Sequence, residues 1–357
     1  MRKIILIIAC IILLDIISCK TDFDINAKWK DIAVVYGLLN PDDNVQFIKI
    51  NRAYLGKGNA ITMASNPDST TYPDGTLEVK IEKWTNGSLQ KTYNLHDTLI
   101  NNKESGIFPS PQQKLFCFYT RATTGDAIDR ESIYKLYIKN TKTNKIINSS
   151  AVIVKKMLSS DISPSSSIMG FTATTQNSIK WKSAADGRKY EVILRFWYVE
   201  INNNPPNDSV EKHIDWNIGS VRATNLTGGE NMDVSYIPGN FLQYIGGKVA
   251  VNSNLSRRVG KEYRNTDLIH DQYTHHLDLI IAVASDDLTT YMDVNAPSND
   301  IVQERPQFTN ITNGIGIFSS RYFDTNKKKF SNVSTAASQD SLINGSHTNN
   351  RNFFFRQ

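Results

Sequence analysis

Residues 77–95 read LEVKIEKWTNGSLQKTYNL, and this stretch decides the fold class. Leu77, Val79 and Ile81 alternate with charged residues, which is the two-residue period of a strand with one buried face. Asn86 and Gly87 separate this run from the next, and a two-residue hairpin turn needs the positive φ angles that these residues tolerate. The stretch therefore predicts two antiparallel strands joined by a tight turn.

The strand pattern extends on both sides of this hairpin. Val45, Phe47 and Ile50 approximate one face of an earlier strand. Further strands are predicted at 114–120, 133–140 and 146–155. Because no convincing helical period is found between them, residues 31–157 are expected to form an antiparallel β-sandwich domain.

A change in composition marks the end of this domain. Residues 158–167 contain six Ser, one Pro and no aromatic residue, which indicates a solvated linker. After it, Trp181 on one predicted strand and Tyr190 on the next resemble the opening of a fibronectin type III domain, where such rings pack between two sheets. The resemblance covers about 30 residues and implies a second sandwich at 168–323.

Several features depart from the plain fibronectin pattern. Residues 240–244 predict a short helix, and Ser285 is suited to cap another that runs to Tyr291. Residues 324–357 are expected to be a polar tail with a possible final strand at 353–355. The predicted fold class is thus all-β, with two antiparallel β-sandwich domains of immunoglobulin or fibronectin III type and short helical insertions.

The amino terminus indicates export. Two basic residues precede an apolar run at 4–17, which is 14 residues long and therefore shorter than the roughly 20 that a spanning helix needs. Residues 1–18 are thus expected to be a signal peptide. The string Ile16-Ile17-Ser18-Cys19 resembles a lipobox, which implies that Cys19 carries acyl chains such as palmitate. The alternative is an ordinary signal peptide with an unmodified Cys19.

Composition excludes several classes of protein. The chain has 357 residues, 40% hydrophobic and 21% charged, which is neither collagen-like nor wholly disordered. A net charge of +5 without a long basic run gives no indication of a nucleic-acid surface. Once Cys19 is acylated, the mature chain has one thiol, Cys117, so its stability is expected to come from packing.

Two strings carry a family resemblance. Residues 35–43, VYGLLNPDD, and 310–318, NITNGIGIF, together with the lipobox, are similar to Bacteroidota lipoproteins of unknown function, often encoded beside TonB-dependent receptors. Residues 19–30 are largely polar and are expected to be a tether from the lipid to the first strand, on either face of the outer membrane. The resemblance implies a cell-envelope accessory protein built from β-sandwiches. It supplies no catalytic residues.

One cluster has the chemistry of metal ligands: His270, Asp271, His275, His276 and Asp278. His276 and Asp278 are two apart on a predicted strand and are expected to share a face. The spacing matches no known tight site, so a polar loop entering a strand is the favoured interpretation and no cofactor is predicted. The phosphate-loop, nucleophile-elbow and zinc-protease motifs are missing from the sequence, and an enzyme is not predicted.

Aromatic residues supply the binding candidates. Trp197 and Tyr198 are neighbours on a predicted strand and point to opposite faces, so at least one ring is expected to be partly exposed for stacking on a sugar or a peptide. The predicted function is a non-catalytic binding or assembly partner of an outer-membrane receptor or secretion machine. A surface adhesin or glycan-binding lipoprotein is the alternative, followed by an envelope hydrolase.

Overall fold

The computed structural model describes residues 31–53, 62, 66–101, 112–121, 126–261, 275–297, 307–332 and 337–355. The signal peptide, Cys19 and the tether lie outside the described residues. Strands dominate, and the predicted all-β class with sandwiches and short helices is confirmed. Within the described ranges, the helices are too short or too polar to cross a bilayer.

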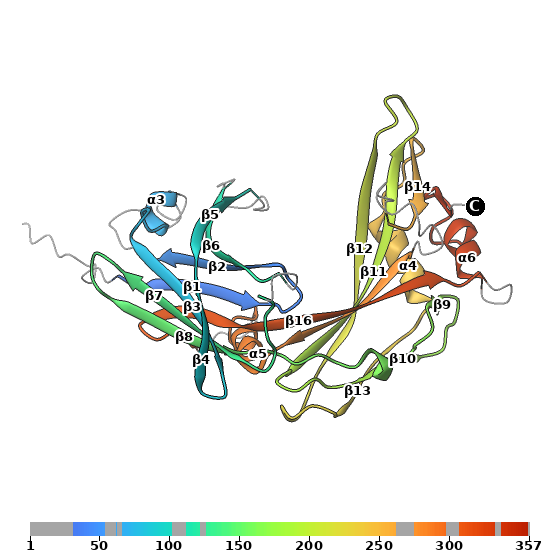
Figure 1. Cartoon of the computed structure of the whole chain (residues 1–357). Helices are drawn as coiled ribbons and strands as arrows, with labels where there is room; N and C mark the ends of the chain where they lie inside the picture. The colour runs from blue at the N-terminus through green and yellow to red at the C-terminus, as the bar shows by residue number, and fades with distance from the viewer. Residues whose placement is uncertain are drawn as a thin grey trace, which may run out of the picture.

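The first sandwich is formed by a four-stranded sheet, in the order β4-β3-β7-β8, packed on strands of a larger sheet (Figure 1). The predicted hairpin is confirmed, because β3 and β4 pair around Asn86 and Gly87, with φ angles of 51° and 76°. The bounds are β1 Ala33–Leu39, β2 Val45–Arg52, α3 Pro67–Thr70, β3 Leu77–Thr85, β4 Ser88–Asn94, β5 His96–Ile100, β6 Gln113–Tyr119, β7 Ile133–Asn140 and β8 Ile146–Val152.

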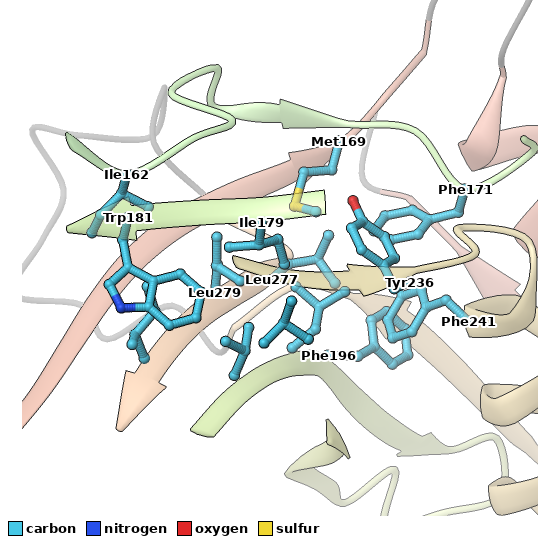
Figure 2. Packing of buried hydrophobic residues seen from close by; sticks show 14 of the residues in the cluster. Ile162, Met169, Phe171, Ile179, Trp181, Phe196, Tyr236, Phe241, Leu277 and Leu279 are labelled. Carbon is cyan, nitrogen blue, oxygen red and sulfur yellow. The ribbon is translucent and has the colours of Figure 1, made fainter. Parts of the chain in front are cut away.

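The second sandwich packs a small β10-β13 sheet and helices α4 and α6 against the other half of the larger sheet. The bounds are η3 Ser159–Asp161, β9 Ile168–Met169, β10 Asn177–Lys182, β11 Lys189–Asn202, β12 Ser209–Arg222, β13 Asn231–Tyr236, α4 Asn240–Lys248, β14 Leu255–Val259, β15 Leu277–Ala284, α5 Asp286–Val294, α6 Ser338–Asn344 and β17 Phe353–Phe354. Figure 2 shows its core, where Phe171 and Phe241 pack with ring centroids 4.5 Å apart and Trp181 lies over the aliphatic residues of β15.

Strand β16, Gly314–Phe330, belongs to both sandwiches. Its first seven residues pair in parallel with β1, and Arg321 to Lys328 pair antiparallel with β15, so one sheet runs through the molecule (Figure 1). Gly316 has a φ of 114°, and a Cβ there would collide with the Val35 carbonyl. The backbones of β16 and β1 therefore approach each other closely at this position, where only glycine fits. The domain boundary placed at residue 323 falls inside β16.

The segment 158–167 lies against the second sandwich, although its composition predicted a solvated linker. Ile162 is buried, Ser163 exchanges backbone hydrogen bonds with Lys180, and the Lys328 ammonium donates to the carbonyls of Pro164 and Ser166 at 2.9 and 2.8 Å. These contacts use the backbone of the segment, whereas its six Ser side chains are exposed to solvent, which accounts for the polar composition. The region expected as a polar tail contains the end of β16, α6 and β17.

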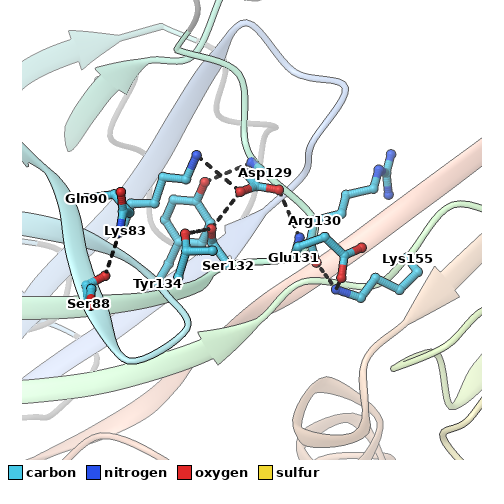
Figure 3. Close-up of polar contacts among 10 residues, drawn as sticks. Lys83, Ser88, Gln90, Asp129, Arg130, Glu131, Ser132, Tyr134 and Lys155 are labelled. Atoms are coloured by element: carbon cyan, nitrogen blue, oxygen red, sulfur yellow. Dashed lines mark hydrogen bonds and ion pairs between the residues drawn. The ribbon is translucent and has the colours of Figure 1, made fainter.

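Polar contacts fix the loop before β7 to the chain leaving β8. Asp129 accepts from Ser132 at 2.7 Å and pairs with Lys83 at 3.2 Å, while Glu131 pairs with Lys155 at 2.9 Å (Figure 3). The backbone amide of Lys155 donates to the carbonyl of Ala185 in the second sandwich. This loop thus contacts the point where the two sandwiches meet.

Candidate binding surface at the junction of the sandwiches

A cavity of about 420 Å³ opens where α5 lies beside the large sheet. Its walls come from both sandwiches, because β1 and β16 form one side and β15, β11 and α5 the other. Most of its lining is apolar. The residues are Tyr36, Leu38, Lys189, Glu191, Ala282, Val283, Ala284, Leu288, Tyr291, Met292, Ile317, Arg321 and Phe323.

Helix α5 is fixed at its start by the cap that the sequence predicted. The Ser285 hydroxyl accepts from the Leu288 amide at 3.4 Å and shares a hydrogen bond with the buried Ser319 hydroxyl of β16 at 2.5 Å. Ion pairs tie the helix to neighbouring strands, Arg188 to Asp286 and Arg222 to Asp293, each at 2.6 Å. The cavity wall formed by α5 is therefore held in place.

Few polar groups lie in the cavity. The Nε atom of Arg321 is buried and lacks a hydrogen-bond partner among the described residues, and the guanidinium stands 5.2 Å from the Phe323 ring centroid. The Glu191 carboxylate accepts from the Asn217 side chain. Burial and a hydrogen bond with Tyr36 raise the pKa of Tyr291 to about 12, so this hydroxyl is neutral at physiological pH.

An exposed apolar face continues from the cavity across the first sandwich. On β1, β2, β6 and β16 the side chains pointing away from the core include Tyr36, Phe47, Tyr119 and Ile315, which are 42%, 41%, 51% and 44% exposed. We call these four residues, with Val34, Leu38 and Val45, the apolar face. Since Tyr36 and Leu38 also line the cavity, the face and the cavity are continuous.

The sequence pattern missed this face because it placed Phe47 and Ile50 on the same face of β2. Ile48 and Ile50 are buried in the core, while Phe47 points outward, so Phe47 and Ile50 do not share a face. Gln46 is also buried, where its amide bonds the backbone of Asn40 and Asp43. The signal that could have revealed the face was the outward alternation of Tyr36 and Leu38 on β1.

The structure brings together three of the residues predicted as site candidates. The Trp197 indole donates to one Asp278 oxygen at 2.6 Å, and His275 Nε2 lies 3.0 Å from the other. Although burial works to raise the pKa of Asp278, these two contacts hold it below its ordinary value. The Lys261 ammonium covers the Trp197 ring at 4.6 Å.

The other candidates lie elsewhere. His276 precedes β15, and its ring packs 5.0 Å from that of Phe355, so it does not share the surroundings of Asp278 as expected. Tyr198 belongs to the core of the second sandwich. His270 and Asp271 lie outside the described residues. Among the residues that are described, no three His, Cys, Asp or Glu side chains gather as a metal site would require.

The expected exposed aromatic ring is not found at these positions. Trp197 and Tyr198 are only 9% and 6% exposed. Tyr198 packs in the core, whereas Trp197 lies on the opposite face beneath Lys261 and beside His213, whose ring centroid is 5.0 Å away. The side chains of β11 therefore alternate between the two faces as predicted, but Lys261 and His213 cover the outward-facing ring of Trp197.

Comparison with known proteins gives no assignment. No family model and no curated protein matches the sequence. Among solved structures, the chain is similar to the C-terminal globular domain of an oligosaccharyltransferase from Pyrococcus abyssi, at 8% identity and a TM-score of 0.24. That match covers 64% of this chain and 45% of the other, so the chain spans less than half the length of the structure it matches.

Proposed function

We propose that the protein is a lipid-anchored accessory protein of the bacterial envelope that docks a partner protein through its apolar face. The observation that carries this proposal is the exposure of Tyr36, Phe47, Tyr119 and Ile315 on one side of one sheet. Contiguous apolar surface of this kind is rare on isolated soluble proteins and marks interaction sites. The role proposed is binding and assembly rather than catalysis.

The anchor rests on the lipobox that ends at Cys19. Residues 19–30 separate it from Ala33, where β1 begins. A tether this short keeps the apolar face close to the bilayer and raises the effective concentration of a membrane partner to roughly millimolar. An outer-membrane protein such as a TonB-dependent receptor is the partner proposed, as the family resemblance implies.

The rigid junction supports a docking role. Because β16 pairs with β1 and β15 in one continuous sheet, the apolar face keeps a fixed orientation relative to the second sandwich. A preformed surface loses less conformational entropy on association than a mobile one. A preformed surface of this kind is suited to binding one specific partner protein.

Photo-cross-linking in intact membranes tests the proposal. A photoreactive phenylalanine analogue at Phe47 or Tyr119 is expected to give one defined cross-linked product. The same analogue at Ser150, exposed on β8 of the opposite sheet, is the matched control and is expected to give none. A lack of product from both face positions, or an equal product from Ser150, would contradict docking through this face. An adhesin would show no fixed membrane partner.

A further inference from the structure

We infer that the junction cavity binds a long-chain carboxylate, with its hydrocarbon chain on the apolar lining and its acidic group paired with Arg321. The cavity shares Tyr36 and Leu38 with the apolar face, but the inference does not rest on the docking role proposed for that face. It would stand even if no partner protein used that face.

The size and lining of the cavity fit such a ligand. Its volume of about 420 Å³ lies within the range of roughly 300–1,000 Å³ typical of small-molecule pockets. Ala282 and Ala284 have small side chains, and Leu38, Leu288 and Met292 supply aliphatic walls. A flexible hydrocarbon chain can follow a surface of this kind without needing polar partners.

Arg321 supplies the argument for an acidic group. Its Nε is buried and without a hydrogen-bond partner in the described part of the chain, which is unfavourable for a strong donor. Guanidinium groups pair with carboxylates through two parallel hydrogen bonds. A carboxylate in the cavity would offer this guanidinium an acceptor, and a rotation of the side chain would bring the buried Nε donor to it.

Other charges in the cavity do not neutralise Arg321. Glu191, the acidic residue of the lining, is held by the Asn217 side chain, and no ion pair joins it to Arg321 among the described residues. Lys189 adds a second positive charge and has no ion pair within the same described ranges. The lining thus carries two basic groups and one acidic group, which favours an anion over a neutral or cationic amphiphile.

Two ligands with twelve-carbon chains, one ending in a carboxylate and the other in an uncharged hydroxyl, test the assignment. The uncharged fluorophore N-phenyl-1-naphthylamine serves as the cavity reporter, and laurate and 1-dodecanol are compared as competitors on the purified mature protein. Laurate is expected to displace the reporter at a concentration at least tenfold lower than dodecanol. Arg321→Gln is expected to abolish this difference, whereas Arg195→Gln, whose guanidinium pairs with Asp215 outside the cavity, is expected to retain it.

A second variant guards against misfolding. Met292 is 39% exposed on α5, so Met292→Trp can fill the opening of the cavity without altering the core. This variant is expected to bind both laurate and dodecanol more weakly. Equal competition by laurate and dodecanol in the wild type would overturn the inference. So would a preference for laurate that survives in Arg321→Gln, or unchanged binding in Met292→Trp.

Discussion

The Ser320 hydroxyl accepts a hydrogen bond from the Val154 amide at 3.1 Å and is fully buried. It also donates to the Val152 carbonyl at 2.7 Å. Ser320 is the last residue of β16 paired with β1, and Val154 lies on the chain that leaves β8 for the second sandwich. One hydroxyl thus joins two of the covalent crossings between the sandwiches.

Replacing Ser320 by Ala should weaken the junction. The change leaves the buried Val154 amide without its acceptor, and an unsatisfied buried group costs about 1–3 kcal/mol. We expect the free energy of unfolding in urea to fall by this amount. Ser150→Ala, at an exposed position of β8, should change it by less than about 0.5 kcal/mol. A loss of similar size in both variants would contradict this role for Ser320.

Gly316→Ala should be among the most damaging small substitutions in the chain. The residue has a φ of 114°, and the added methyl would meet the Val35 carbonyl of the adjacent strand. Strained φ angles alone cost about 1–3 kcal/mol. Because the collision adds to this cost, the loss of unfolding free energy should exceed that range. Gly247→Ala in α4, with open space around its Cβ, is the control and should be neutral or stabilising by up to about 1 kcal/mol. Thermal unfolding of the two variants distinguishes them.

His276 should make stability depend on pH in a defined window. Burial, followed by the nearby Lys329 and His275, lowers its pKa from 6.5 to about 4, and its Nδ1 accepts from the Phe330 amide at 3.2 Å. Between these values the unfolded chain binds more protons than the folded one, so stability falls as the pH falls from 6.5 to 4. The difference between the pKa of His276 in the unfolded and the folded chain corresponds to about 3 kcal/mol of unfolding free energy.

Denaturant unfolding across this pH window checks the assignment. His276→Gln keeps a polar group near the Phe330 amide. It should remove the part of the pH dependence of the unfolding free energy that His276 causes. His96→Gln, on β5 of the first sandwich, should leave the component in place. An unchanged slope in His276→Gln would show that other groups cause it.

Asp278→Asn should disturb the environment of Trp197. The substitution removes the charge that faces His275 at 3.0 Å and weakens the acceptor for the indole N–H. We expect a loss of about 1–3 kcal/mol in unfolding free energy and a shift in tryptophan emission. Asp233→Asn, on the exposed side of β13, is the control. An unaltered emission spectrum in Asp278→Asn would contradict the contact with Trp197.

Short-range features of the fold could be predicted from the sequence. The hairpin at Asn86 and Gly87 depends on local φ angles, and the Ser285 cap depends on one hydroxyl and an amide three residues later. Each is encoded by adjacent residues. The strand that contains Val79 and Ile81 could be predicted equally well, because its hydrophobic residues recur with a period of two, and both side chains are buried in the core.

Features set by distant contacts could not be predicted in this way. The parallel pairing of β16 with β1 joins residues about 280 positions apart, and nothing near Gly316 specifies its partner. The burial of Trp197 depends on Lys261, which lies in the segment that follows β14. The cavity escaped prediction for the same reason, since Tyr36, Tyr291 and Arg321 meet only in the folded chain.

Docking through the apolar face is tested most directly by native electrophoresis of detergent-solubilised outer membranes. The wild-type protein should migrate in an assembly clearly larger than the isolated mature chain. The double variant Phe47→Glu with Tyr119→Glu should migrate as the isolated chain, while Ser150→Glu should remain assembled. Wild-type protein that already migrates alone, or a double variant that stays in the assembly, would contradict the proposal.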